Sequence, residues 1–144
     1  MKRSRSKLSP SLTAKIRRQA LYRCGYCLSS EILLGAPMEI EHLRPLAIGG
    51  ASSEDNLWLA CRRCNGFKSA RTEAEDPITK QLTALFNPRA QNWQDHFQWS
   101  DDGSMIVGLT PCGRATVSAL RLNASGICAT RRLWASVGWW PPSE

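Results

Sequence analysis

The chain has 144 residues, 42% of them hydrophobic, and a formal net charge of +7, which suits one folded domain with a modest core. No run of about 18 apolar residues occurs, and no apolar segment follows the basic N-terminus, so we expect a cytoplasmic protein with no membrane partner. Residues 1–71 hold 13 Lys and Arg against 5 Asp and Glu, whereas residues 72–144 hold 6 against 7. This asymmetry favours a nucleic-acid partner for the first half, although a merely soluble basic surface would have the same composition.

The N-terminal segment predicts a basic arm followed by a helix. Residues 1–9 include four Lys and Arg and are typical of a disordered arm. A helix is expected over residues 10–23, because Leu12, Ile16 and Ala20 recur at the spacing of one helix face.

Four of the six cysteines form two Cys-x-x-Cys pairs with 33 residues between them: Cys24, Cys27, Cys61 and Cys64. Each pair offers two thiolates from one tight turn, and Zn²⁺ takes four of them in a closed tetrahedral site. Disulfides are disfavoured without a secretory signal, and a redox pair is disfavoured because there are two pairs and no βαβ pattern. The sequence therefore predicts a structural Zn²⁺ site. Cys112 and Cys128 are expected to be small buried hydrophobic side chains.

The stretch between the cysteine pairs predicts a strand, a loop, a strand and a helix. Residues 38–42 and 57–60 are typical of short strands, and residues 44–55, with Pro and Gly-Gly, are typical of a turn-rich loop. A helix is expected to start near Cys64. Because a closed zinc site has no position for substrate, the chemistry must come from other residues of this stretch.

Glu41 and His42 are followed by Asn56, fourteen residues after the histidine, and by Asn65, nine residues further on. Combined with the two cysteine pairs, this pattern over roughly residues 21–71 resembles the HNH endonuclease family in its His-Asn-Asn form. The resemblance implies an α+β fold built around a ββα-metal motif. It also implies that His42 is the general base, that Asn56 braces the loop that aims it, and that Glu41 and Asn65 bind a catalytic metal ion.

Elementary chemistry supports these roles. An imidazole with an ordinary pKa near 6.5 accepts a proton at neutral pH, and carboxylate and amide oxygens suit Mg²⁺ or Mn²⁺. The residue before the histidine is often Asp in the family, and Glu41 is longer by one methylene, but its ligand chemistry is unchanged. Glu39 lies on the same strand face and is either a partner of the metal ligands or a solvated residue.

Basic residues around the motif are expected to contact phosphates, which gives affinity without sequence information. They are Arg44, Arg62, Arg63, Lys68 and Arg71. We expect hydrolysis of DNA, most readily duplex DNA, and the resemblance implies products with 3′-hydroxyl and 5′-phosphate ends. A homodimer is one route to cutting both strands. Two alternatives stay open: a zinc-stapled nucleic-acid-binding module without catalysis, and a nuclease that acts on RNA.

Residues 76–144 are expected to form an α+β extension that packs on the core of residues 10–75 within one domain. A β-hairpin with Asp102-Gly103 at its tip is predicted, followed by a helix from Thr110-Pro111 to about residue 122 and an amphipathic segment over residues 127–134. Tryptophans are expected to form much of this core. They are Trp93, Trp99, Trp134, Trp139 and Trp140.

Two features of the second half have alternative interpretations. His96 is either a phosphate or metal contact that folds over the active site or a hydrogen-bonded histidine at the start of a strand. Asn87 and Arg89, in the sequence FNPR, either complete the DNA cleft or only pack against the hairpin.

Overall fold

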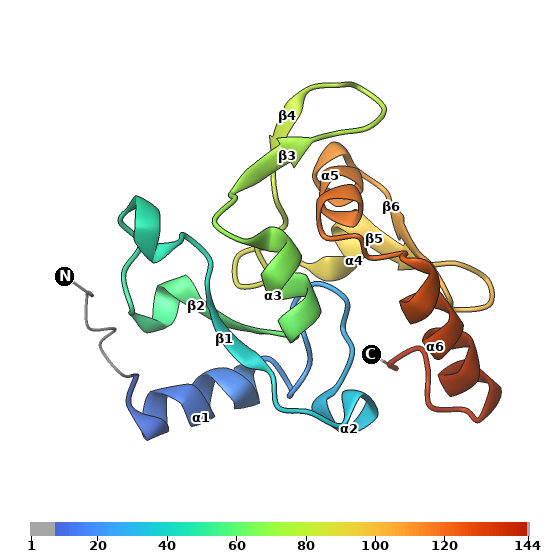
Figure 1. The fold of residues 1–144 in the computed structure, drawn as a ribbon, viewed down its shortest axis with the longest axis horizontal. Coiled ribbons are helices and arrows are strands. Elements are labelled where there is room, and N and C mark those ends of the chain that lie inside the picture. The colour runs from blue at the N-terminus through green and yellow to red at the C-terminus, as the bar shows by residue number, and fades with distance from the viewer. Residues whose placement is uncertain (1–7, 144) are drawn as a thin grey trace.

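The computed structural model of the chain describes residues 8–143 and has an α+β fold, which confirms the predicted class (Figure 1). Most of the predicted N-terminal arm, residues 1–7, lies outside the described residues. The α-helices are α1 (Pro10–Gln19), α2 (Glu31–Leu34), α3 (Arg62–Lys68), α4 (Trp93–His96), α5 (Pro111–Ala119) and α6 (Ser125–Ser136). The strands are β1 (Glu39–His42), β2 (Leu57–Ala60), β3 (Glu73–Glu75), β4 (Leu82–Ala84), β5 (Phe97–Trp99) and β6 (Ile106–Gly108).

Helix α1 begins as its sequence predicts but ends earlier. The Ser9 hydroxyl accepts a hydrogen bond from the backbone N–H of Leu12 at 3.1 Å, and Pro10 occupies the first turn, where its missing N–H is not needed. The predicted end at residue 23 is wrong, because Leu21 and Tyr22 have φ values of 55° and 58°. These left-handed residues turn the chain from the helix into the first cysteine pair.

Strands β1 and β2 form an antiparallel pair in which Glu41 lies opposite Trp58 and His42 lies opposite Leu57. The chain then enters α3 directly after Cys61, whose sulfur lies 3.4 Å from the backbone N–H of Cys64. This order confirms the strand, loop, strand and helix that the sequence predicts. Figure 1 shows α3 between the β1–β2 pair and the elements of the second half.

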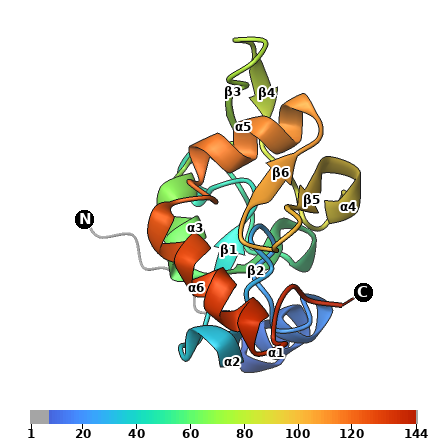
Figure 2. The same ribbon diagram turned by 90° about the vertical axis from the view of Figure 1, so that its right-hand side faces the viewer.

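The second half contains two further antiparallel hairpins. The β5–β6 hairpin, with Gly103 in its turn at a φ of 72°, and α5, capped by the Thr110 hydroxyl, confirm the predicted elements. Helix α5 ends at Ala119 rather than near residue 122. The β3–β4 hairpin was not predicted, and it projects beyond α5 in both views (Figure 1 and Figure 2).

The two halves share one hydrophobic core. It includes Tyr26 and Leu59 from the first half and Phe97 and Leu120 from the second. Among the described residues, no helix is long and apolar enough to cross a membrane.

The tryptophans contribute unequally to this core. Trp134 and Trp140 are buried, and Trp93 donates its indole N–H to the carbonyl oxygen of Tyr26 at 2.8 Å, which ties the halves together. The expectation for Trp139 is wrong, because its side chain is 64% exposed.

Candidate active site and cysteine cluster

The four paired cysteines meet in the interior, and their sulfur atoms all lie within 4.8 Å of one another. The Sγ atoms of Cys27 and Cys61 are 3.8 Å apart. In a tetrahedral site with Zn–S bonds of about 2.3 Å, neighbouring sulfurs are separated by about 3.8 Å. The cluster is therefore positioned to hold a metal ion, as the sequence predicts, whereas Cys112 and Cys128 lie outside it.

Backbone and hydroxyl groups surround the sulfurs. The N–H of Tyr26 lies 3.5 Å from Cys24 Sγ, and Ser29 Oγ lies 3.2 Å from Cys27 Sγ. Burial raises the pKa of the Cys24 thiol. Burial thus favours the neutral thiol, and a bound cation would be needed to hold all four sulfurs as thiolates.

The predicted general base and both predicted ligands of the catalytic metal line one cavity of about 460 Å³. Strand β1 contributes Glu41 and His42, and α3 contributes Asn65. The Nε2 atom of His42 lies 3.0 Å from the hydroxyl of Ser52, which belongs to the loop between the strands. The fold thus brings together an imidazole, a carboxylate and an amide that are up to 24 positions apart in the sequence.

Glu41 is almost completely buried at the edge of this cavity. Its Oε1 atom accepts a hydrogen bond from the Tyr26 hydroxyl at 2.7 Å and lies 2.7 Å from the ammonium group of Lys68. Its Oε2 atom is also buried and has no hydrogen-bond partner among the described residues. Burial raises the pKa of Glu41, and the nearby charge of Lys68 opposes that shift.

Lys68 is placed differently from our expectation of a phosphate contact. Its side chain is only 3% exposed, and its ammonium also lies 3.3 Å from the carbonyl oxygen of Leu43. Because it forms a buried ion pair with Glu41, it positions a residue of the cavity rather than facing a DNA surface.

Asn56 holds the loop that follows His42. Its amide nitrogen donates to the carbonyl oxygens of Arg44 at 3.0 Å and Ala51 at 2.8 Å, and its oxygen accepts from the N–H of Arg44 at 2.8 Å. These three bonds tie the start of the loop and its Ala51 backbone to Asn56 at the end of the loop, which is the geometry expected of a bracing residue.

Asn65 uses only its amide nitrogen within the described part of the chain. That nitrogen donates to Oε1 of Glu39 at 2.9 Å, so Glu39 orients the amide. The Asn65 oxygen and the buried Oε2 of Glu41 are hard donors at one cavity. The residues present therefore fit a divalent cation such as Mg²⁺ or Mn²⁺.

The predicted phosphate contacts other than Lys68 lie at or near the surface. Arg62 is exposed at the start of α3, and Arg44 donates to the carbonyl oxygen of Ile48 at 3.0 Å. Arg63 has its guanidinium carbon 5.3 Å from the ring centre of Phe67.

Helix α3 and the residues that follow it are tied to the second half of the chain. Arg63 donates to the carbonyl oxygen of Arg121, and Arg71 donates to that of Ala119 at 3.1 Å. These contacts use some of the guanidinium N–H groups of Arg63 and Arg71 that we expected to bind phosphate.

His96 and Arg89 lie outside the cavity that contains His42. His96 Nδ1 is 2.7 Å from the Thr110 hydroxyl, which matches the interpretation of a hydrogen-bonded histidine next to a strand. Arg89 donates from Nη2 to the carbonyl oxygen of Leu57 at 2.9 Å and stacks over the ring of Trp58 at 4.9 Å. It therefore packs against the β1–β2 hairpin.

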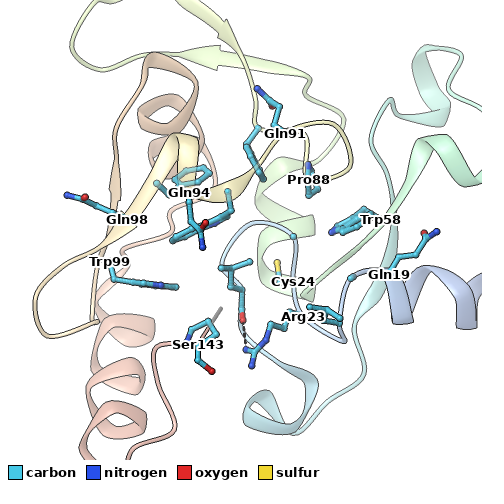
Figure 3. A pocket seen from close by; sticks show the side chains of 18 of the residues that line it. Gln19, Arg23, Cys24, Trp58, Pro88, Gln91, Gln94, Gln98, Trp99 and Ser143 are labelled. Carbon is cyan, nitrogen blue, oxygen red and sulfur yellow. Dashed lines mark hydrogen bonds between the residues drawn. The ribbon is translucent and has the colours of Figure 1, made fainter.

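A second cavity, of about 520 Å³, lies where the two halves meet (Figure 3). Trp58 and Gln19 flank it from the first half, and Trp99 and Gln98 flank it from the second. None of the predicted catalytic residues lines it. Sequence reasoning missed this cavity, because no local pattern shows which aromatic residues of the two halves will face each other.

Comparison with known proteins supports the assignment of the first half. Residues 24–71 match the family model described as HNH endonuclease. This range includes both cysteine pairs and the three cavity residues that the sequence predicts, and it confirms the resemblance. No curated protein and no solved structure matches the chain.

Proposed function

We propose, on the premise that residues 24–71 form an HNH endonuclease domain, that the protein is a metal-dependent endonuclease that hydrolyses phosphodiester bonds of duplex DNA. The observation that carries this proposal is the convergence of Glu41, His42 and Asn65 on one cavity, with a buried carboxylate oxygen that lacks a partner among the described residues. A buried charged oxygen without a partner is costly unless the site gains a cation.

His42 acts as the general base in this proposal. It takes a proton from the attacking water, and the neighbouring Ser52 hydroxyl, 3.0 Å from Nε2, limits the orientations of the imidazole ring. Asn56 holds the loop that follows the histidine through its three backbone hydrogen bonds. The expected products have 3′-hydroxyl and 5′-phosphate ends.

Glu41 and Asn65 would hold Mg²⁺ or Mn²⁺ through their oxygens. When bound, such an ion stabilises the negative charge that develops on the phosphate and on the departing oxygen. Lys68 keeps Glu41 oriented and favours its ionised form. Glu39 orients Asn65 by accepting a hydrogen bond from its amide nitrogen, which leaves the amide oxygen for the cation.

The cysteine cluster has a separate role in this proposal. Cys24, Cys27, Cys61 and Cys64 would bind one structural Zn²⁺, and four thiolates leave no coordination position for water or substrate. Zinc would then stabilise α3, which begins at the second cysteine pair and contributes Asn65 to the cavity.

DNA binding is assigned to the basic residues around the cavity. Arg44, Arg62, Arg63 and Arg71 remain the proposed phosphate contacts, since each has an exposed or half-exposed side chain. A single cavity cuts one strand at a time, and a homodimer would be one route to cleavage of both strands.

A plasmid cleavage assay tests the proposed activity. Supercoiled DNA should be nicked or linearised by the parent protein only with Mg²⁺ or Mn²⁺, and His42→Ala should cut roughly 100- to 10,000-fold more slowly. His96→Ala is the matched control, because its ring bonds to Thr110 outside the cavity, and it should retain activity. Equal cleavage by the parent and His42→Ala would remove His42 from the mechanism.

One observation favours a second candidate, a zinc-stapled module that binds nucleic acid without cutting it. The Lys68 ammonium lies 2.7 Å from Glu41 and already balances its charge, so the carboxylate does not depend on a metal ion for neutrality. This candidate predicts DNA binding by the parent and by His42→Ala, with no cleavage by either protein at any metal concentration.

A further inference from the structure

Arg131 of α6 is a charged side chain that the proposed mechanism does not use. It is fully buried, and it is one of the largest side chains in the interior. Its Nη1 atom donates to the carbonyl oxygen of Ser104 at 2.9 Å, and its guanidinium carbon lies 5.9 Å from the ring centre of Trp99. Its Nε and Nη2 atoms are buried with no acceptor among residues 8–143.

No carboxylate balances this charge within the described part of the chain. The ion pairs found there involve other cations, including the adjacent Arg132, which lies 3.7 Å from Asp102. A buried guanidinium without an anionic partner is strongly unfavourable. The position of Arg131 therefore implies a negative charge nearby that is not a carboxylate.

Four metal-bound thiolates of the cysteine cluster would supply such a charge. Ile127 lines a cavity together with Cys27 and Cys61, and Arg131 follows Ile127 by four residues on the same face of α6. Burial lowers the pKa of Arg131, and negative charge on the sulfurs of Cys27, Cys128 and Cys64, two of which belong to the cluster, acts in the opposite direction. Four thiolates around one Zn²⁺ carry a net charge of −2.

We propose that Arg131 is the charge-compensating residue of the zinc–thiolate centre, supplying its buried positive charge beside that centre. The inference rests on the zinc site of the proposed function. It assigns a role in metal binding to a residue well outside residues 24–71. It also gives a physical reason for α6 to pack on the first half, because the helix brings a positive charge to a zinc–thiolate centre with a net charge of −2.

Zinc affinity tests the proposal directly. The probe is Zn²⁺ alone, titrated into the full chain in competition with a chromophoric chelator. Arg131→Met keeps most of the side-chain volume but removes the charge, and it should bind zinc roughly 10- to 100-fold more weakly. Arg131→Lys keeps the charge and should lie between the two. Arg132→Met removes a charge from the next, 59% exposed residue and should leave the affinity unchanged.

A spectroscopic measurement separates this role from simple packing. Co²⁺ bound to four thiolates absorbs through sulfur-to-metal charge transfer, and those bands respond to the position of a positive charge near the sulfurs. Arg131→Lys should shift these charge-transfer bands. If Arg131→Met fails to fold, the bands of Arg131→Lys test the role of Arg131 instead. Unchanged bands, or equal zinc affinity for Arg131→Met and the parent, would overturn the role of Arg131. A parent protein that binds neither Zn²⁺ nor Co²⁺ would overturn the zinc site itself, and the role of Arg131 with it.

Discussion

The cysteine cluster and the His42 cavity are two candidate metal sites with opposite chemistry, although they lie in the same stretch of chain. The cluster gathers four soft, buried sulfurs within 4.8 Å, whereas the cavity offers oxygen donors and an imidazole around about 460 Å³ of open space. Soft donors that close around an ion hold it as part of the fold. Hard donors at an open cavity leave room for water and phosphate.

Helix α3 connects the two sites. Its consecutive residues Cys64 and Asn65 belong to the cluster and to the cavity respectively, because neighbouring residues of a helix point in directions about 100° apart. Loss of the cluster should therefore also damage the cavity, whereas loss of a cavity ligand should leave the cluster intact. The following predictions test this asymmetry, starting with the largest expected effect.

The largest effect is expected from Cys64→Ser. Structural zinc contributes about 10–16 kcal/mol to the folding of small zinc domains, so the variant should lose bound zinc, cooperative unfolding and cleavage together. Circular dichroism and elemental analysis would measure the first two. Cys112→Ala is the control, because that half-buried thiol lies outside the cluster. A folded and active Cys64→Ser protein would show that the cluster is dispensable.

Chelation should separate the sites without any mutation. Brief treatment with EDTA should abolish cleavage by emptying the open cavity while the enclosed zinc stays bound, and added Mg²⁺ or Mn²⁺ should restore the rate. Zinc content and plasmid nicking would be followed in the same samples. If zinc departs in step with activity, the two sites do not differ in the way proposed.

A smaller, selective effect is expected at the cavity ligand Asn65. Asn65→Ala removes one oxygen donor, so the Mn²⁺ concentration for half-maximal cleavage should rise, with zinc content unchanged. Glu39→Gln serves as the matched comparison, since it weakens only the hydrogen bond that orients Asn65. We expect it to raise that concentration by less. An equal or larger rise for Glu39→Gln would point to Glu39 as the ligand.

The smallest effect is expected at the bracing residue. Asn56→Ala loses three hydrogen bonds to the loop backbone and should lower the free energy of unfolding by about 1–3 kcal/mol. It should slow cleavage less than His42→Ala, because the imidazole remains but is less well aimed. Urea denaturation and the nicking rate would measure the two effects, and unchanged values of both would show that the loop is held by other contacts.

The local features of the sequence predicted the first half well. The spacing of the cysteines and the short alternating strands are set by chemistry within about 50 residues, so β1, β2, α3 and the cluster lie where they were expected. Helix α1 was predicted too long, because its end depends on the left-handed turn at Leu21 and Tyr22 that leads into the cluster.

Long-range contacts explain what the sequence could not show. A lysine such as Lys68 is usually exposed to solvent, and only the folded chain reveals that it is buried against Glu41. The same holds for Arg131, whose neighbours come from distant segments. Polar residues that are buried by tertiary structure carry no local signal that distinguishes them from solvated ones.

The most direct test of the account is the rate of supercoiled-plasmid cleavage against Mn²⁺ concentration, measured on zinc-loaded parent and Glu41→Gln proteins. Glu41→Gln replaces the carboxylate in the cavity by an uncharged amide and leaves the four cysteines in place. The account predicts a rate that saturates with Mn²⁺ for the parent and little or no cleavage by the variant, with equal zinc content. Indistinguishable curves for the two proteins, or no cleavage by a parent that binds DNA and zinc, would contradict it.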